Sequence, residues 1–263
     1  MKQQLTPRKA NLWMLISLLL IVGVAMLLLR QCSHRTSSPF ASDFVKSQGD
    51  TLDVAIELNP ACYGVRGDSI FGRDYEILQR ISAVGGRPMK FHPFVPLKYA
   101  LDGLDAGRFD MVVASMPLTA DLRDRYLMTD PVYLDRQILV QHPDSAGDVR
   151  ITSATELGGR TVWIPADSPI ATRLKNLADE IGDSIHVVAS PDYSAEQLFI
   201  LAAKGDIPAA VVNEEVARRM SPDYPEADVS TPVSLTQFQA WALRKDATAL
   251  ADSINSWLHA VSH

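Results

Sequence analysis

The chain has 263 residues, 47% of them hydrophobic and 21% charged, and a formal net charge of -6. This composition is typical of a globular protein, and the length suffices for one large domain or two small lobes behind an N-terminal anchor. The negative charge argues against nucleic acid as a main partner, because phosphate binding needs clustered Lys and Arg.

Residues 10–29 form an apolar run that a helix of about 30 Å would carry across a bilayer. Lys2, Arg8 and Lys9 precede this run, so the positive-inside rule places residues 1–9 in the cytoplasm. A cleaved signal peptide is the alternative, but the run is long for one and no A-x-A site follows it. We therefore predict a single-pass anchor in the inner membrane, with the rest of the chain in the periplasm.

Residues 30–50 are rich in Ser and predict a tether, and the α/β domain begins at residue 51. Strands are predicted at 51–57, 89–94 and 111–114, with a helix after each of the first two. The first of these helices opens at Gly72, with Asp74 as its cap or first-turn acid. This βαβαβ order indicates a mostly parallel sheet with helices on both faces, and we assign residues 51–136 to a first lobe.

A second α/β round follows. Its strands are predicted at 161–164, 185–188 and 209–212, and another strand runs from Phe238 to Leu243. We assign residues 137–243 to a second lobe and expect an amphipathic helix in residues 244–263 to return to the first lobe. Two such rounds predict two lobes with a cleft between them.

The first candidate wall of the cleft follows the buried strand at Met111. Ser115 and Thr119 lie in the polar turn after this strand, and Arg123 lies in the first turn of a short helix. Ligands bind at the carboxyl ends of strands in open α/β sheets, and a guanidinium can hold a carboxylate through two hydrogen bonds. The alternative is that Arg123 is a solvent-exposed helix arginine.

The second candidate wall combines Asp167 and Ser168, at a predicted helix N-terminus, with Glu214 at a strand end. A helix N-terminus offers free N–H groups to an anion, and Glu214 would bind an ammonium group. Tyr63 and Tyr133 are candidates for lining the cleft. The structural alternatives are capping for Asp167 and Ser168, a solvated first-turn acid for Glu214, and edge packing for the two tyrosines.

Four ordered motifs resemble those of the bacterial extracellular solute-binding proteins of family 3, which have the type II periplasmic-binding fold. The helix start G-F-D-x-E/D, the A-L-x-x-G-x-x-D helix, the F-T/S-D-P-Y-Y element and S-L-x-D-L-K-G-K-x-V are similar to residues 71–76, 100–110, 128–133 and 153–162. The resemblance implies a periplasmic-binding-protein-like fold that closes on a small ligand. In amino-acid binders of this family the carboxylate-binding arginine corresponds to Leu122, one residue before Arg123, while Glu214 falls at the ammonium-binding acid.

Within this family the chain is most similar to the N-terminal, non-catalytic domain of the membrane-bound lytic murein transglycosylase F group. That group shares the F-G-x-D-Y-E start and a tryptophan in the last strand, here Trp241. Its catalytic glutamate lies in a separate C-terminal domain, in an E-S-x-W motif that this sequence does not contain. The resemblance therefore implies a binding module without the enzyme.

Three hypotheses follow. The first is a membrane-anchored extracytoplasmic protein that binds an amino acid, short peptide or cell-wall fragment, for transport or sensing, with a transporter permease or cell-wall enzyme as its partner. The second is a non-catalytic regulatory or scaffold module related to murein transglycosylases, with a degenerate cleft. The third is a small-carboxylic-acid lyase on the same fold. Common hydrolase, metalloprotease, P-loop and dinucleotide motifs are absent from the sequence, and we predict no cofactor and no metal.

Overall fold

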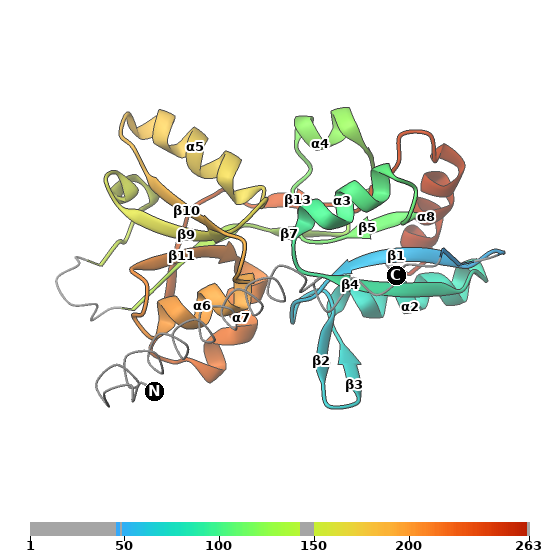
Figure 1. Cartoon of the computed structure of the whole chain (residues 1–263), viewed down its shortest axis with the longest axis horizontal. Coiled ribbons are helices and arrows are strands. Elements are labelled where there is room, and N and C mark those ends of the chain that lie inside the picture. Colours follow the sequence, from blue (N-terminus) through green and yellow to red (C-terminus); the bar gives the residue numbers. More distant parts are fainter. Residues whose placement is uncertain (1–45, 48, 143–149, 262–263) are drawn as a thin grey trace, which may run out of the picture. The chain divides into compact units, whose positions relative to one another are not determined.

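The computed structural model describes residues 46–47, 49–142 and 150–261 (Figure 1). The predicted cytoplasmic segment (1–9), the predicted anchor (10–29) and most of the predicted tether (30–50) lie outside these residues. The described part of the chain contains no helix with both the length and the hydropathy of a membrane span.

The first sheet has the order β4-β1-β5-β14-β6 and forms lobe 1 together with its helices. Its strands are β1 (Leu52–Glu57), β4 (Met89–Phe94), β5 (Met111–Val113), β6 (Leu127–Met128) and β14 (Ala242–Leu243). β4, β1 and β5 are parallel, whereas β14 pairs antiparallel with both β5 and β6. Val54, Ala55 and Ile56 are fully buried, as expected for a central strand covered on both faces.

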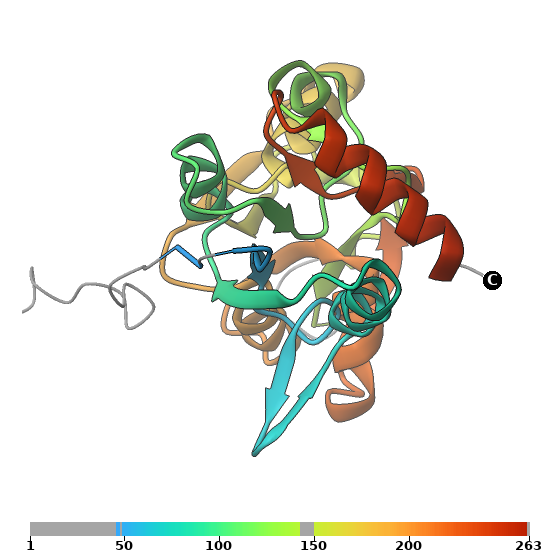
Figure 2. The same ribbon diagram turned by 90° about the vertical axis from the view of Figure 1, so that its right-hand side faces the viewer.

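Four helices belong to lobe 1: α2 (Arg73–Gly85), α3 (Leu97–Asp105), α4 (Ala120–Arg125) and α8 (Thr248–Val261). Leu78 and Ile81 of α2 pack in one core with Ile254 and Leu258 of α8. The C-terminal helix therefore closes lobe 1 although it is distant from α2 in sequence. A hairpin of β2 (Gly64–Arg66) and β3 (Ser69–Phe71) extends away from the sheet (Figure 2).

The second sheet has the order β10-β9-β11-β8-β12 and forms lobe 2. Its elements are β8 (Gln137–Gln141), η1 (Ala154–Leu157), β9 (Thr161–Pro165), α5 (Ile170–Ile181), β10 (His186–Ser190), α6 (Ala195–Ala203), β11 (Ala209–Asn213), α7 (Glu214–Met220), η2 (Ser221–Asp223) and β12 (Asp228–Pro232). Each face of the sheet has its own core. Leu139 and Leu174 belong to one core, and Val140 and Phe199 belong to the other.

A two-stranded sheet of β7 (Tyr133–Asp135) and β13 (Gln237–Gln239) lies where the chain passes between the lobes, and we call it the hinge. The chain leaves lobe 1 through β7 and enters lobe 2 at β8. It returns through β13 to β14. The predicted strand Phe238–Leu243 is therefore two short strands, β13 and β14, and the return to lobe 1 precedes the last helix.

The sheets are mixed, so the prediction of mostly parallel sheets is correct for only part of each. Three neighbouring strands pair in parallel in each sheet, and the other pairs are antiparallel, because β14 in the first sheet and β8 in the second run against the remaining strands. The parallel strands are joined by helical crossovers, which require parallel pairing. The antiparallel strands β8 and β14 instead follow the hinge crossings, where no helix constrains their direction.

Candidate functional site

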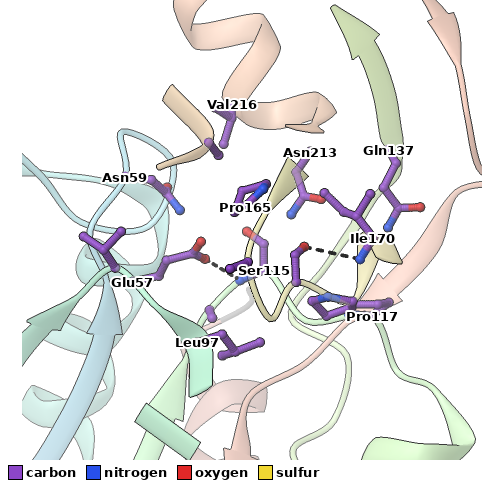
Figure 3. A pocket seen from close by; sticks show the side chains of 16 residues that line it. Glu57, Asn59, Leu97, Ser115, Pro117, Gln137, Pro165, Ile170, Asn213 and Val216 are labelled. Carbon is purple, nitrogen blue, oxygen red and sulfur yellow. Dashed lines mark hydrogen bonds between the residues drawn. The ribbon is translucent and has the colours of Figure 1, made fainter. Parts of the chain in front are cut away.

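A small pocket lies between the two lobes, with a volume of about 50 Å³. This volume holds a few water molecules, at about 10–15 Å³ each. Lobe 1 contributes Glu57, Asn59, Val95, Leu97, Ala114, Ser115 and Pro117, and lobe 2 contributes Gln137, Pro165, Ala166, Ser168, Pro169, Ile170, Ala195, Asn213 and Val216 (Figure 3). The lining is thus mostly apolar with a few polar side chains, as is usual for ligand sites.

Glu57 is the last residue of β1 and carries the one carboxylate in this lining. Its Oε2 accepts hydrogen bonds from the Ser115 backbone N–H (3.1 Å, Figure 3) and the Cys62 thiol (3.8 Å). The Asn59 side chain also hydrogen-bonds it. Burial raises the pKa of Glu57, and these neutral donors offset the increase only in part.

Ser115 connects the pocket to the hinge. The Tyr133 hydroxyl of β7 donates to Ser115 Oγ at 3.0 Å, and the Arg73 guanidinium lies 3.2 Å from the centroid of the Tyr133 ring. Burial raises the pKa of Tyr133, so its hydroxyl remains a neutral donor. Ser115 is therefore in direct contact with the hinge strand β7.

Several buried polar atoms near this site have no hydrogen-bond partner. They are Gln137 Oε1, Arg73 Nη2, Asp74 Oδ2 and Asp135 Oδ2. Each unsatisfied group costs about 1–3 kcal/mol, a cost that proteins tend to accept at functional sites. Asp74 is an acid of the first turn of α2, as expected, but it is not the cap, because the cap is Gly72 without a side-chain bond and Asp74 is fully buried beside Arg73.

Asp135 makes the stability of the hinge depend on pH. Burial raises its pKa to about 6, compared with about 3.9 in an unfolded chain. A carboxyl whose pKa is higher in the folded state binds its proton more tightly there, so folding is stabilised as pH falls through 6 and the gain saturates near 4. Between about pH 7.5 and 4.5 this group should add roughly 2 kcal/mol to the free energy of unfolding.

Asp135→Asn should lack this contribution, because an amide does not titrate in this pH range. The amide oxygen keeps an acceptor for the Arg136 and Glu215 N–H groups that now bind Asp135 Oδ1, so the hydrogen bonds of the hinge are retained. Denaturant unfolding of both proteins at the two pH values measures the difference. Equal pH dependence in the wild type and in Asp135→Asn would contradict the assignment.

Of the predicted first-wall residues, Ser115 lines the pocket, while Thr119 and Arg123 are not in the lining. Thr119 caps α4, accepting from the Leu122 N–H at 3.4 Å. The Arg123 side chain is exposed, and its backbone carbonyl accepts from Lys245 Nζ. The predicted ligand contacts of Thr119 and Arg123 stay predictions.

Of the predicted second-wall residues, Ser168 lines the pocket, and its Oγ also accepts from the Ile170 N–H at 3.2 Å. Asp167 is exposed in a turn with φ of 57°. Glu214 binds Arg136 through two hydrogen bonds of 2.9 and 2.6 Å. The Glu214 carboxylate that was predicted to bind an ammonium group is thus paired with Arg136. The ligand role of Glu214 also stays a prediction.

The two tyrosines occupy different environments. Tyr63 packs in the core of lobe 1, with its ring centroid 5.4 Å from that of Tyr75 and 6.2 Å from that of Phe91. Tyr133 lies behind Ser115 and reaches the pocket through it. Neither tyrosine is in the pocket lining, and their predicted contacts with a ligand also stay predictions.

Glu57, Asn59, Gln137 and Asn213 line the pocket but were not predicted from the sequence. Glu57 and Asn213 end the buried strands β1 and β11, so the strand-end rule used for Ser115 also points to them. Gln137 is the first residue of β8, and no motif marks this position.

The sequence profile of the bacterial extracellular solute-binding proteins, family 3, matches residues 52–263. The chain belongs to this family. Among curated relatives, membrane-bound lytic murein transglycosylase F of Desulfosudis oleivorans is 27% identical over 216 residues, covering 79% of this chain and 45% of the relative. The Aeromonas hydrophila protein of that name is 26% identical over 227 residues, covering 86% and 44%. The chain therefore spans less than half the length of these relatives.

Solved structures share the fold. The holo form of ArgBP from T. maritima has a TM-score of 0.70 and 23% identity, covering 81% of this chain and 91% of ArgBP. The GluR0 ligand-binding core from Nostoc punctiforme, in complex with L-glutamate, has a TM-score of 0.67 and 16% identity, covering 80% and 92%. At these identities the likeness establishes the periplasmic-binding-protein-like architecture. The family and the architecture together identify a ligand-binding module, as predicted from the sequence motifs.

Proposed function

We propose that this protein is an extracytoplasmic solute-binding protein that holds a small polar ligand in the pocket between its lobes. The observation that carries the proposal is the pocket itself, whose polar side chains come from both lobes and include the strand-end residues Glu57 and Asn213. A ligand that contacts both lobes favours their closed arrangement, because only that arrangement offers all of the contacts. The predicted anchor at residues 10–29 would keep this module at the periplasmic face of the inner membrane.

The ligand classes are an amino acid, a short peptide or a cell-wall fragment. Ser115 and Ser168 are our proposed hydroxyl contacts, because both line the pocket. Handing the ligand to a transporter permease and reporting its presence to a cell-wall enzyme are the two uses that fit an anchored binding module.

A second candidate is a non-catalytic module that regulates or positions a murein-processing enzyme. It is favoured by the curated relatives, which are named as membrane-bound lytic murein transglycosylases and extend well beyond the region that matches this chain. In this candidate the pocket need not bind a ligand.

Filling the pocket separates the two candidates. Ala195 lines the pocket at the start of α6, so Ala195→Trp should occupy the space that a ligand needs. In a thermal-shift screen of the full-length chain in detergent, with amino acids, short peptides and muropeptides, the wild type should show a ligand-dependent rise in Tm. Ala195→Trp should lower the affinity for that ligand at least about tenfold.

Ala249→Trp is the matched control, because Ala249 is exposed on α8, outside the pocket lining. It should keep the ligand response of the wild type. If no compound changes the Tm of the wild type, the solute-binding proposal fails and the regulatory module is favoured. A response that survives Ala195→Trp would place the ligand outside this pocket.

A further inference from the structure

The pocket lining carries one kind of charge. Glu57 is its only charged residue, and no Lys, Arg or His from the described part of the chain is among the lining residues. The hydrogen bonds that Glu57 receives come from Ser115, Cys62 and Asn59, which are all neutral. No side-chain cation of the lining is therefore available to a ligand carboxylate, and the carboxylate of Glu57 has no positive partner within it.

The neutral polar groups of the lining add hydrogen-bond acceptors. Gln137 is only 3% exposed, and its Oε1 has no hydrogen-bond partner. Asn213 makes no side-chain cap bond to α7, and Figure 3 shows it and Glu57 extending toward the centre of the pocket from opposite sides. Gln137 and Asn213 thus line the pocket from lobe 2, while the acid Glu57 lines it from lobe 1.

The helix N-terminus at the pocket offers few free donors to an anion. The first N–H groups of α5 are already bound within the turn, Ile170 N to Ser168 Oγ at 3.2 Å and Ala171 N to Ser168 O at 3.1 Å. This arrangement favours capping over anion binding at Ser168.

A second carboxyl lies close to this group. Glu196 follows the lining residue Ala195, and burial together with the negative charge of Glu57 raises the pKa of Glu196 to about 7. Burial also raises the pKa of Glu57. Both pKa values are raised for the same reason: the carboxyl groups are removed from water, and no nearby cation in the described part of the chain stabilises their charged forms. A bound cation would supply that stabilisation.

We propose that the pocket recognises a small primary ammonium group, held by Glu57 of lobe 1 and by the side-chain amide oxygens of Gln137 and Asn213 of lobe 2. This inference rests on the proposed solute-binding function and specifies its ligand: an amine, or the amino end of a larger molecule, whose carboxylate is not bound in the pocket. An ammonium group has N–H donors in a roughly tetrahedral arrangement, which suits acceptors approaching from two lobes. Because those acceptors belong to both lobes, the same contacts link recognition to closure.

The volume of about 50 Å³ restricts the group to a few heavy atoms. The probes are therefore ethylammonium, its anionic counterpart propionate, and the zwitterion glycine. Ligand-observed NMR titration of the full-length chain in detergent gives the affinity for each probe at neutral pH. Ethylammonium should bind, and propionate should bind at least about tenfold more weakly, because charge-assisted hydrogen bonds are lost and the Glu57 carboxylate repels it.

Glu57→Gln keeps the shape of the side chain and an acceptor for the Ser115 N–H but removes the charge. It should weaken ethylammonium binding about 10- to 100-fold, since hydrogen bonds to charged groups are stronger than neutral ones. Gln137→Met, of similar size but without the amide oxygen, is the second variant and should weaken binding about 3- to 10-fold. Ala249→Trp, on α8 and outside the lining, should leave the affinity unchanged. The Tm of each variant without ligand shows that it is folded.

The outcomes separate the two levels of the proposal. If propionate or glycine binds and ethylammonium does not, or if Glu57→Gln binds ethylammonium as tightly as the wild type, the ammonium inference is wrong while the solute-binding function stands. If no probe binds but a compound of the larger screen binds in a manner blocked by Ala195→Trp, the ammonium inference is again overturned. If neither the probes nor the screen gives binding, the solute-binding function fails as well.

Discussion

Gly72→Ala is expected to lower the free energy of unfolding by about 3–5 kcal/mol. Gly72 has φ of 135°, a conformation that side chains other than hydrogen rarely adopt, and an added Cβ would lie 2.3 Å from the Cys62 carbonyl oxygen. That oxygen cannot move aside easily. It accepts the Tyr75 N–H at 3.1 Å, and the Arg73 N–H binds the neighbouring Ala61 carbonyl at 2.8 Å. The start of α2 is thus docked against the loop that carries the pocket residue Asn59.

Gly67→Ala is the matched control for this prediction. Gly67 lies in the turn between β2 and β3, also with positive φ (59°), but a Cβ there meets no atom within 4 Å. Only the conformational cost of about 1–2 kcal/mol applies. Denaturant unfolding of the two variants compares them, and equal losses of stability would contradict the docking of α2 through Gly72.

Trp241→Ala is expected to cost about 3–5 kcal/mol. Trp241 is 0% exposed and packs in the core of lobe 1. In the sequence it lies between the hinge strand β13 and β14. Its backbone is fixed by two hydrogen bonds with Thr129, at 2.9 and 3.0 Å, so the surrounding structure has little freedom to fill the cavity. Trp241 Nε1 is buried without a hydrogen-bond partner, which destabilises the folded state. Because the substitution removes this unpaired N–H group, the loss of stability should fall toward the lower end of that range.

Phe238→Ala provides the comparison, since Phe238 is an aromatic residue of the adjacent β13 that is 55% exposed. Its loss should cost no more than about 1 kcal/mol. Chemical unfolding followed by circular dichroism gives both values. A Trp241→Ala protein as stable as Phe238→Ala would show that the lobe 1 core does not depend on Trp241.

The fold was largely predictable because its strands carry strong local signals. Residues 209–213 are a nearly continuous apolar run, and Leu52, Val54 and Ile56 alternate along β1. The helices between strands have clear starts and stops, as at Gly86, which ends α2 in the left-handed conformation. A strand was predicted over β14 but not its antiparallel direction, which depends on where the chain crosses the hinge, and β6 was not predicted because it is only two residues long. Such long-range pairing leaves no periodicity in the sequence.

The site was predicted less completely than the fold. Ser115 and Ser168 line the pocket, and both were found by asking which polar residues follow a strand or precede a helix. The same criterion selected Glu214 instead of its neighbour Asn213, because a carboxylate can form an ion pair with an ammonium group and an amide cannot. Whether a strand-end residue reaches a ligand depends on its partners. Arg136 holds Glu214, while the partners of Glu57 are neutral.

The most direct test of this account is hydrogen exchange of the full-length chain with and without the tightest-binding amine, amino acid or muropeptide from the titrations and the screen. A ligand held between the lobes should slow exchange in both lobes at once, at the Ser115 turn of lobe 1 and at the β11–α7 junction around Asn213 of lobe 2. Slower exchange should be absent in Ala195→Trp at the same ligand concentration. Protection confined to one lobe, or located away from these two segments, would contradict the assignment of the interlobe pocket as the binding site.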